Sequence, residues 1–225
     1  MIRKKLIKRT VILDLDGTLV NVDCFKLFLI KILMHSPSRW IYIPLLIINV
    51  IFFYLNPQYT RTRLKLFFLK IIIKDQRKIY IEKQANSFAN FIIKFKLNKQ
   101  IFNYIKIYQQ QKFYIVLATG SLNVYALEIA SLLGINYVIS SKLSGNQKTY
   151  DGFFLNDNCV GKVKFEAINK FLKNNNINWS ETIFFSDHHS DLPIFKKSKI
   201  NFAVKPTALL IKELKKNNIN HEVIN

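Results

Sequence analysis

The sequence of 225 residues contains only two cysteines, Cys24 and Cys159, and neither has the spacing of a metal-ligand motif. We therefore expect neither a disulfide framework nor a zinc site, and a reducing compartment is predicted. The N-terminal segment 1–9 is basic but has no apolar stretch and no cleavage site of small residues, so we do not expect a secretory signal. A chain of this length can bury a full core, as one domain or as one domain with an inserted lobe.

Acidic residues are also scarce: there are 14 aspartates and glutamates against 34 lysines and arginines, which gives a formal net charge of +20. Such a surface attracts phosphates and anionic membranes. The basic residues are spread over nearly every segment, together with abundant isoleucine and asparagine, and they form no stripe interleaved with aromatic residues. Nucleic-acid binding is therefore not expected.

Against this acid-poor background, two aspartates one residue apart directly follow the apolar run 11–13 and precede Gly17. An apolar run that ends in carboxylates is typical of a buried strand that delivers acids to a sheet edge. Because side chains alternate along a strand, Asp14 and Asp16 share one face. The alternative is a strand followed by an ordinary Asp-Gly turn. Burying an acid without a compensating cation or proton is costly, which favours a functional pair.

The pattern changes after Val20, where long apolar helical segments continue to about Gln111. From residue 112 short apolar strands alternate with helices, which predicts an α/β fold with a Rossmann-like, doubly wound parallel sheet. We assign residues 1–20 and 112–225 to this sheet domain and residues 21–111 to a helical insertion. The expected strands are 113–118, 135–139, 151–154, 182–186 and 199–204, and the expected helices are 122–133, 163–173 and 208–216.

Polar groups follow three of these strands, at Asp14 and Asp16, at Thr119, and at Asp187 and Asp191. Open α/β sheets bind their ligands at this edge, outside the carboxyl ends of the strands. The agreement of three separate strand ends therefore predicts one site.

This combination resembles the haloacid dehalogenase-like (HAD) superfamily of phosphatases, in its subfamily IB of phosphoserine phosphatase-like proteins. Residues 14–18, Asp-Leu-Asp-Gly-Thr, match the first motif of the superfamily, and Thr119 matches the second. Asp187 and Asp191 match the acidic fourth motif. The third motif is a lysine, for which Lys162 and Lys164 are both candidates, and the pattern Gly-x-x-Lys favours Lys164. The resemblance implies that the insertion is a helical cap of C1 type.

The resemblance also implies a mechanism. Asp14 would attack phosphorus and form an aspartyl phosphate, and Asp16 would act as general acid and base. Mg²⁺ is the expected cofactor, because carboxylate and carbonyl oxygens suit a hard cation. Its ligands would be Asp14, the main-chain carbonyl of Asp16, and Asp187.

The remaining motif residues would neutralise the phosphoryl oxygens: Thr119, the Gly120 amide and Lys164, with Asp191 in the second shell, orienting the lysine. Other polar residues near the motifs are expected to have lesser roles. We expect Ser121 to be a secondary phosphate donor at most and Asp23 to start a helix. His188 and His189 are not expected to be metal ligands or a general base.

The insertion contains a strongly apolar stretch, 40–55, within a segment that carries no charge from Trp40 through Thr60. The stretch is shorter than the roughly 20 residues that cross a bilayer, and Pro44 and Asn49 interrupt it. It is either a buried core helix of the cap or, together with the apolar segment 25–34, a shallow helical hairpin or monotopic anchor. Basic residues flank it and favour the membrane alternative: Lys31, Arg39, Arg61, Arg63 and Lys65.

Within the superfamily the chain looks most similar to the branch that contains phosphatidylglycerophosphatase C. Pro-Leu-Leu at 44–46, Cys-Val-Gly at 159–161 and Leu-Pro at 192–193 carry this likeness. It implies removal of phosphate from a lipid head group, phosphatidylglycerophosphate to phosphatidylglycerol, at the cytoplasmic side of the cell membrane. Two alternatives stay open. One is a soluble, cytoplasmic, phosphoserine-like phosphatase whose apolar segment forms the core of the cap, and the other is a non-catalytic membrane- or anion-binding protein on the same fold.

Overall fold

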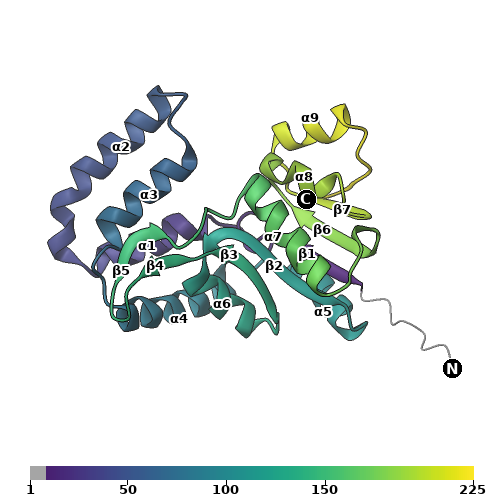
Figure 1. Ribbon diagram of the computed structural model, residues 1–225, viewed down its shortest axis with the longest axis horizontal. Coiled ribbons are helices and arrows are strands. Elements are labelled where there is room, and N and C mark those ends of the chain that lie inside the picture. The colour runs from purple at the N-terminus through teal and green to yellow at the C-terminus, as the bar shows by residue number, and fades with distance from the viewer. Residues whose placement is uncertain (1–8) are drawn as a thin grey trace.

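A six-stranded parallel sheet forms the centre of the protein, in the order β3-β2-β1-β6-β7-β8 (Figure 1). The computed structural model describes residues 9–225, so the expectation for segment 1–9 falls almost entirely outside them. The predicted α/β fold with a doubly wound parallel sheet is confirmed. The strands are β1 (Thr10–Leu13), β2 (Tyr114–Leu122), β3 (Tyr137–Ser141), β6 (Thr182–Ser186), β7 (Ile200–Val204) and β8 (Glu222–Ile224).

Helices cover both faces of this sheet because the strand residues alternate between two apolar layers. In β1, Ile12 belongs to the layer that includes α7 (Gly161–Asn174), α8 (Leu192–Phe195) and α9 (Ala208–Lys216). Val11 and Leu13 point to the opposite layer. That layer includes α5 (Lys99–Gln110) and α6 (Asn123–Leu132).

The insertion after β1 consists of α1 (Cys24–Met34), the 3₁₀ helix η1 (Pro37–Tyr42), α2 (Ile43–Leu55), α3 (Arg61–Ile72) and α4 (Lys78–Phe95). An aromatic cluster joins it to the sheet domain: the rings of Phe28 in α1, Phe88 in α4 and Tyr125 in α6 have centroids 4.9 to 5.3 Å apart. The short strand expected at 151–154 is β5 (Tyr150–Phe154), which pairs with β4 (Leu143–Gly145) in a separate antiparallel ribbon beside α3.

The helix α5 lies within the range 21–111 but packs against the sheet. The ring of Tyr104 lies 5.8 Å from the rings of both Phe185 and Phe202. The division of the chain into 1–20 with 112–225 and 21–111 stays a prediction.

The apolar helix α2 runs beside α3, far from the α9 end of the molecule (Figure 1). Among the described residues, Pro37–Leu55 is the one stretch long and apolar enough to cross a membrane by length and composition, and only 6% of its most apolar window is buried. Leu46 is the buried residue of α2. The alternative that this segment forms the buried core of the cap is therefore wrong, because its apolar side chains face outward.

Candidate active site

Asp14 lies directly after β1, with its carboxylate beside the ammonium group of Lys164. The Lys164 Nζ is 3.1 Å from Asp14 Oδ1, and the backbone nitrogen of Leu15 donates to the same oxygen at 2.8 Å. Burial raises the pKa of Asp14 to about 7; Lys164 opposes the shift and the neighbouring carboxylates add to it. A partly exposed carboxylate held by one cation at the end of a central strand is well placed to act as a nucleophile.

Of the two candidate lysines, Lys164 lies in the site and Lys162 does not. The side chain of Lys162 is exposed and pairs with Glu166 at 3.7 Å. The buried Lys164 donates to Asp191 Oδ2 at 2.7 Å, and the same oxygen accepts a hydrogen bond from Ser186 Oγ at 2.7 Å. Burial disfavours the charge on Lys164, but its two carboxylate neighbours outweigh that effect and raise its pKa above the usual value.

Asp187 approaches the first motif from β6, and the approach requires a glycine. A Cβ on Gly17 would lie 2.3 Å from Asp187 Oδ2, and Gly17 has a positive φ of 74°. Asp187 Oδ1 is buried and has no hydrogen-bond partner among the described residues. Burial raises the pKa of Asp187 to about 6. Lys164 opposes this shift, but among the described residues Asp187 forms no ion pair.

These features fit a divalent cation. Residues 9–225 contain no cluster of three histidine, cysteine, aspartate or glutamate side chains that could by itself hold a metal ion. A Mg²⁺ site needs fewer protein ligands, because the ion keeps water and takes oxygens from a phosphate. Asp14, Asp187 and the carbonyl of Asp16 are the groups that would hold it, and the unpartnered Asp187 oxygen is the observation that supports the fit.

Both carboxylate oxygens of Asp16 are engaged. The backbone nitrogen of Cys24 donates to Oδ1 at 2.9 Å and Ser121 Oγ donates to Oδ2 at 2.6 Å. Burial raises the pKa of Asp16, while these hydrogen bonds oppose the shift. The Ser121 hydroxyl is thus directed to Asp16, and its expected role, a secondary phosphate donor at most, stays a prediction.

Thr119 and Gly120 lie within β2, which continues to Leu122 past the expected end at residue 118. The strand is longer because Leu122 pairs with Ser141 of β3 after a shift in register. Thr119 Oγ1 accepts a hydrogen bond from the backbone nitrogen of Ser121 at 3.0 Å. A Cβ on Gly120 would lie 2.6 Å from a methyl group of Val160, so any side chain here would force Val160 to move.

Sequence reasoning missed the contribution of α3, whose N-terminal residues contact strand β2 and two loops of the sheet domain. Lys65 Nζ donates to the Gly120 carbonyl at 2.9 Å, and its pKa is lowered by burial. Arg61 Nη1 lies 3.2 Å from His188 Nε2. Asn158 Nδ2 donates to Thr62 Oγ1 at 3.0 Å. Helical spacing places these α3 residues on one face, but it does not say what that face contacts.

The two other polar expectations concern the histidines and Asp23. Burial, His189 and Arg61 lower the pKa of His188 to about 4, so its ring is neutral and accepts a hydrogen bond from the backbone nitrogen of Ser190 at 3.1 Å. Asp23 caps α1, because its Oδ1 accepts from the backbone nitrogen of Lys26 at 3.0 Å. The expected helix start at Asp23 is confirmed.

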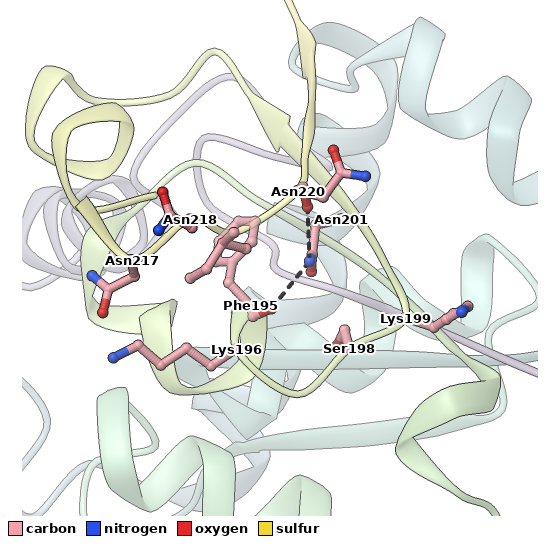
Figure 2. Close-up of a pocket in the computed structure, with 9 residues that line it drawn as sticks. Phe195, Lys196, Ser198, Lys199, Asn201, Asn217, Asn218 and Asn220 are labelled. Atoms are coloured by element: carbon pink, nitrogen blue, oxygen red, sulfur yellow. Dashed lines mark hydrogen bonds between the residues drawn. The ribbon is translucent and has the colours of Figure 1, made fainter. Parts of the chain in front are cut away.

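A surface cavity of about 530 Å³ lies elsewhere, between α8 and the segment after α9 (Figure 2). Asn201 Nδ2 donates there to the carbonyls of Phe195 at 3.0 Å and Asn220 at 3.2 Å. The lining includes Lys196 and Lys199 but no acidic side chain and no motif residue. This cavity is therefore separate from the candidate active site.

Comparisons with known proteins agree with this geometry. The model of the haloacid dehalogenase-like hydrolase family matches residues 11–196. None of the curated protein sequences compared with the chain matches it. A solved protein of unknown function from Bordetella pertussis Tohama I is 16% identical, with a TM-score of 0.82 over 97% of this chain and 99% of that one.

Two other solved structures carry more informative names. A phospho-aspartyl intermediate analogue of phosphoserine phosphatase is 16% identical, with a TM-score of 0.65 over 97% of this chain and 93% of that one. A phosphoserine phosphohydrolase-like protein from Francisella tularensis subsp. tularensis SCHU S4 is 20% identical, with a TM-score of 0.57 over 96% and 94%. At these identities the similarity shows the shared fold.

Proposed function

Because the chain belongs to the haloacid dehalogenase-like hydrolase family, we propose that it is a Mg²⁺-dependent phosphomonoester hydrolase that works through an aspartyl phosphate. The observation that carries this proposal is the contact of Asp14 Oδ1 with Lys164 Nζ at 3.1 Å, beside the unpartnered carboxylate oxygen of Asp187. A nucleophile, a fixed positive charge and a vacant oxygen ligand meet at the carboxyl ends of β1 and β6.

The proposed reaction has two steps. Asp14 attacks phosphorus while Asp16 protonates the departing oxygen, so that the P–O bond to the leaving group breaks as the bond to Asp14 forms. Asp16 then takes a proton from a water molecule, which attacks the aspartyl phosphate and releases inorganic phosphate. Bound Mg²⁺ would supply charge compensation for Asp14, Asp187 and the phosphoryl oxygens.

The other motif residues position the phosphoryl group. Lys164 provides a buried positive charge, and Asp191 orients it: Asp191 Oδ2 accepts hydrogen bonds from Lys164 Nζ and from Ser186 Oγ. Thr119 and the Gly120 amide lie on β2, the strand beside β1. We propose that these groups bind the equatorial oxygens, where charge increases in the transition state.

For the substrate, we propose a phosphorylated lipid head group, phosphatidylglycerophosphate in the first place, at the cytoplasmic side of the cell membrane. The support is the exposed apolar surface of η1 and α2, whose 13-residue α2 is about 20 Å long at 1.5 Å per residue. α2 alone is shorter than the ~30 Å of a hydrocarbon core, whereas the whole stretch Pro37–Leu55 is long enough to cross it. We propose that the segment lies in the interface, because Pro44 and the polar Asn49 interrupt it. Tyr59 donates to the side chain of Asn49 at 3.2 Å and so satisfies the polar group in this surface.

The basic residues near α2 have more specific partners than the sequence indicates. Arg39 donates to the carbonyls of Ile71 and Lys74 at the end of α3, and Lys65 is directed into the site. Arg63 is exposed. Attraction to an anionic bilayer would therefore come from Arg63 and from the overall charge of +20 rather than from a dedicated flank.

A panel of phosphate-release assays tests both the aspartyl-phosphate mechanism and the lipid substrate. Phosphatidylglycerophosphate, phosphatidate, phosphoserine and a sugar phosphate are compared with and without Mg²⁺, with Asp14→Asn as the inactive control. Mg²⁺-dependent release that persists in Asp14→Asn would contradict the aspartyl-phosphate mechanism. A wide preference for phosphoserine or the sugar phosphate would contradict the lipid substrate.

The second candidate is a phosphatase for a small soluble monoester such as phosphoserine. The likeness of the fold to phosphoserine phosphatase, at a TM-score of 0.65, is the observation that favours it. In that case the protein stays soluble without detergent, does not bind anionic vesicles, and hydrolyses phosphoserine at a higher kcat/KM than the lipids.

A further inference from the structure

A buried chain of hydrogen bonds ends on Asp16. The hydroxyl of Tyr125 donates to Ser121 Oγ at 3.0 Å, and Ser121 Oγ donates to Asp16 Oδ2 at 2.6 Å. Ser121 and Tyr125 have no exposed surface. Ser121 lies near the end of β2 and Tyr125 in the first turn of α6, so the end of one element and the start of the next supply the two hydroxyls.

The direction of these hydrogen bonds follows from the number of protons that each hydroxyl can donate. A serine hydroxyl has one proton to donate and can accept as well. Because Tyr125 already donates to Ser121 Oγ, the serine proton is free to point to Asp16. The other carboxylate oxygen is held by the backbone nitrogen of Cys24 at 2.9 Å. Contacts from two sides therefore fix both the position and the rotation of the Asp16 carboxylate.

We propose that Ser121 and Tyr125 are positioning residues for the general acid and base, and that they do not bind the phosphoryl group. This inference rests on the proposed role of Asp16. Proton transfer to a leaving oxygen requires the acid within hydrogen-bond reach and correctly oriented, so a carboxylate free to rotate is a poorer acid. The ring of Tyr125 has a separate, structural task in the cluster with Phe28 and Phe88.

The leaving group gives a test that a purely structural role would not affect. An alkyl phosphate such as glycerol 1-phosphate needs a proton on its departing oxygen, whereas p-nitrophenyl phosphate departs as a stable anion. The quantity to compare is kcat/KM, which reports the steps up to departure of the leaving group. Loss of a positioned acid therefore lowers kcat/KM for the alkyl ester more than for the aryl ester.

The variants are Ser121→Ala and Tyr125→Phe, and the second keeps the aromatic ring. We expect Ser121→Ala to lower kcat/KM for the alkyl phosphate at least tenfold more than for the aryl phosphate. Tyr125→Phe should give a smaller loss, several-fold, with the same preference. The matched control is Ser198→Ala, which removes a hydroxyl that has no hydrogen-bond partner among the described residues and lies at the remote cavity (Figure 2). It should behave as the wild type.

Equal losses of kcat/KM for both esters in the folded variants would overturn the inference. A raised KM for both esters with unchanged kcat would also overturn it, because that result indicates a residue that binds the phosphoryl group. Thermal unfolding of each variant identifies any that does not fold. If Ser121→Ala does not fold, the comparison of the two esters is made with Tyr125→Phe. Asp16→Asn separates this inference from the proposed function. If wild type and Asp16→Asn are equally active on the alkyl ester, the proposed role of Asp16 itself fails.

Discussion

Replacing three isoleucines of α2 with glutamine should detach the protein from membranes without unfolding it. Ile47, Ile48 and Ile51 are 55%, 61% and 52% exposed, so more than half of the surface of each is free to enter a membrane. Complete burial of such a side chain is worth about 1.5–3 kcal/mol. Burying the exposed half of each in a bilayer interface therefore contributes about 1 kcal/mol, and the three together about 3–4 kcal/mol.

A loss of this size corresponds to a roughly 100- to 1,000-fold weaker partition into vesicles, since 1.4 kcal/mol is a factor of ten. The assay is sedimentation with phosphatidylglycerol vesicles, together with hydrolysis of a water-soluble phosphate ester. Vesicle binding should fall by two to three orders of magnitude. Hydrolysis of the soluble ester and the thermal midpoint should stay close to wild type, because α2 contacts none of the motif residues through a hydrogen bond or ion pair among the described residues.

A matched triple variant shows whether the effect belongs to α2. Ile79, Ile107 and Leu209 are exposed apolar residues on α4, α5 and α9. Their replacement with glutamine removes a similar apolar area and should leave vesicle binding unchanged. Undiminished binding of the α2 variant, or an equal loss in the control, would refute the assignment of α2 as the docking surface.

Three further outcomes follow from the site. Gly17→Ala should abolish activity and lower stability, because its Cβ would clash with Asp187 Oδ2 at a backbone conformation with positive φ; thermal unfolding and a phosphate-release assay check both effects. Lys164→Met should abolish turnover and destabilise the fold by about 3–5 kcal/mol in the absence of Mg²⁺, because the buried Asp191 and the partly exposed Asp14 lose their cation; urea unfolding measures this loss. The pKa values of Asp14 and Asp187 are raised to about 7 and about 6, so the folded protein binds more protons than the unfolded chain between about pH 4 and pH 7. Their contribution to stability therefore decreases as the pH rises through this window, and melting curves should show that Mg²⁺ stabilises most above pH 7 and that Asp187→Asn reduces this dependence on pH.

Much of the sheet domain can be predicted from the sequence, because the residue patterns that indicate its strands and helices are local. The strands β1 and β6 are short apolar runs that end in aspartates, and alternation along β1 already separates Ile12 from Val11 and Leu13. The terminal helix appears at the expected residues 208–216. The end of β2 was misplaced because its last pairing, Leu122 with Ser141, depends on a partner strand and not on the residues of β2 alone.

The spacing of the motifs selects Asp14, Asp16, Thr119, Asp187 and Asp191 as candidates, since strand ends of a parallel sheet meet at one edge. Between the two lysines, the spacing only favours one. The structure places Lys164 beside Asp14 and leaves Lys162 in solvent, because side chains two positions apart in α7 point to nearly opposite sides of the helix. The roles of these residues in catalysis stay predictions for the assays above.

By itself, the sequence determined the parallel sheet, the family and the residues that gather at its edge, because each depends on periodicity or on short motifs. Only the tertiary structure decided which groups the insertion brings to that edge. Lys65, 55 residues before Gly120, donates to its carbonyl, and no local pattern indicates that contact. The tertiary structure also showed that the apolar side chains of α2 face outward, because the burial of a helix depends on which elements pack against it. The two aspartates that follow β1 were visible from the start, but the hydroxyls that hold Asp16 become neighbours only when β2 and α6 fold beside β1.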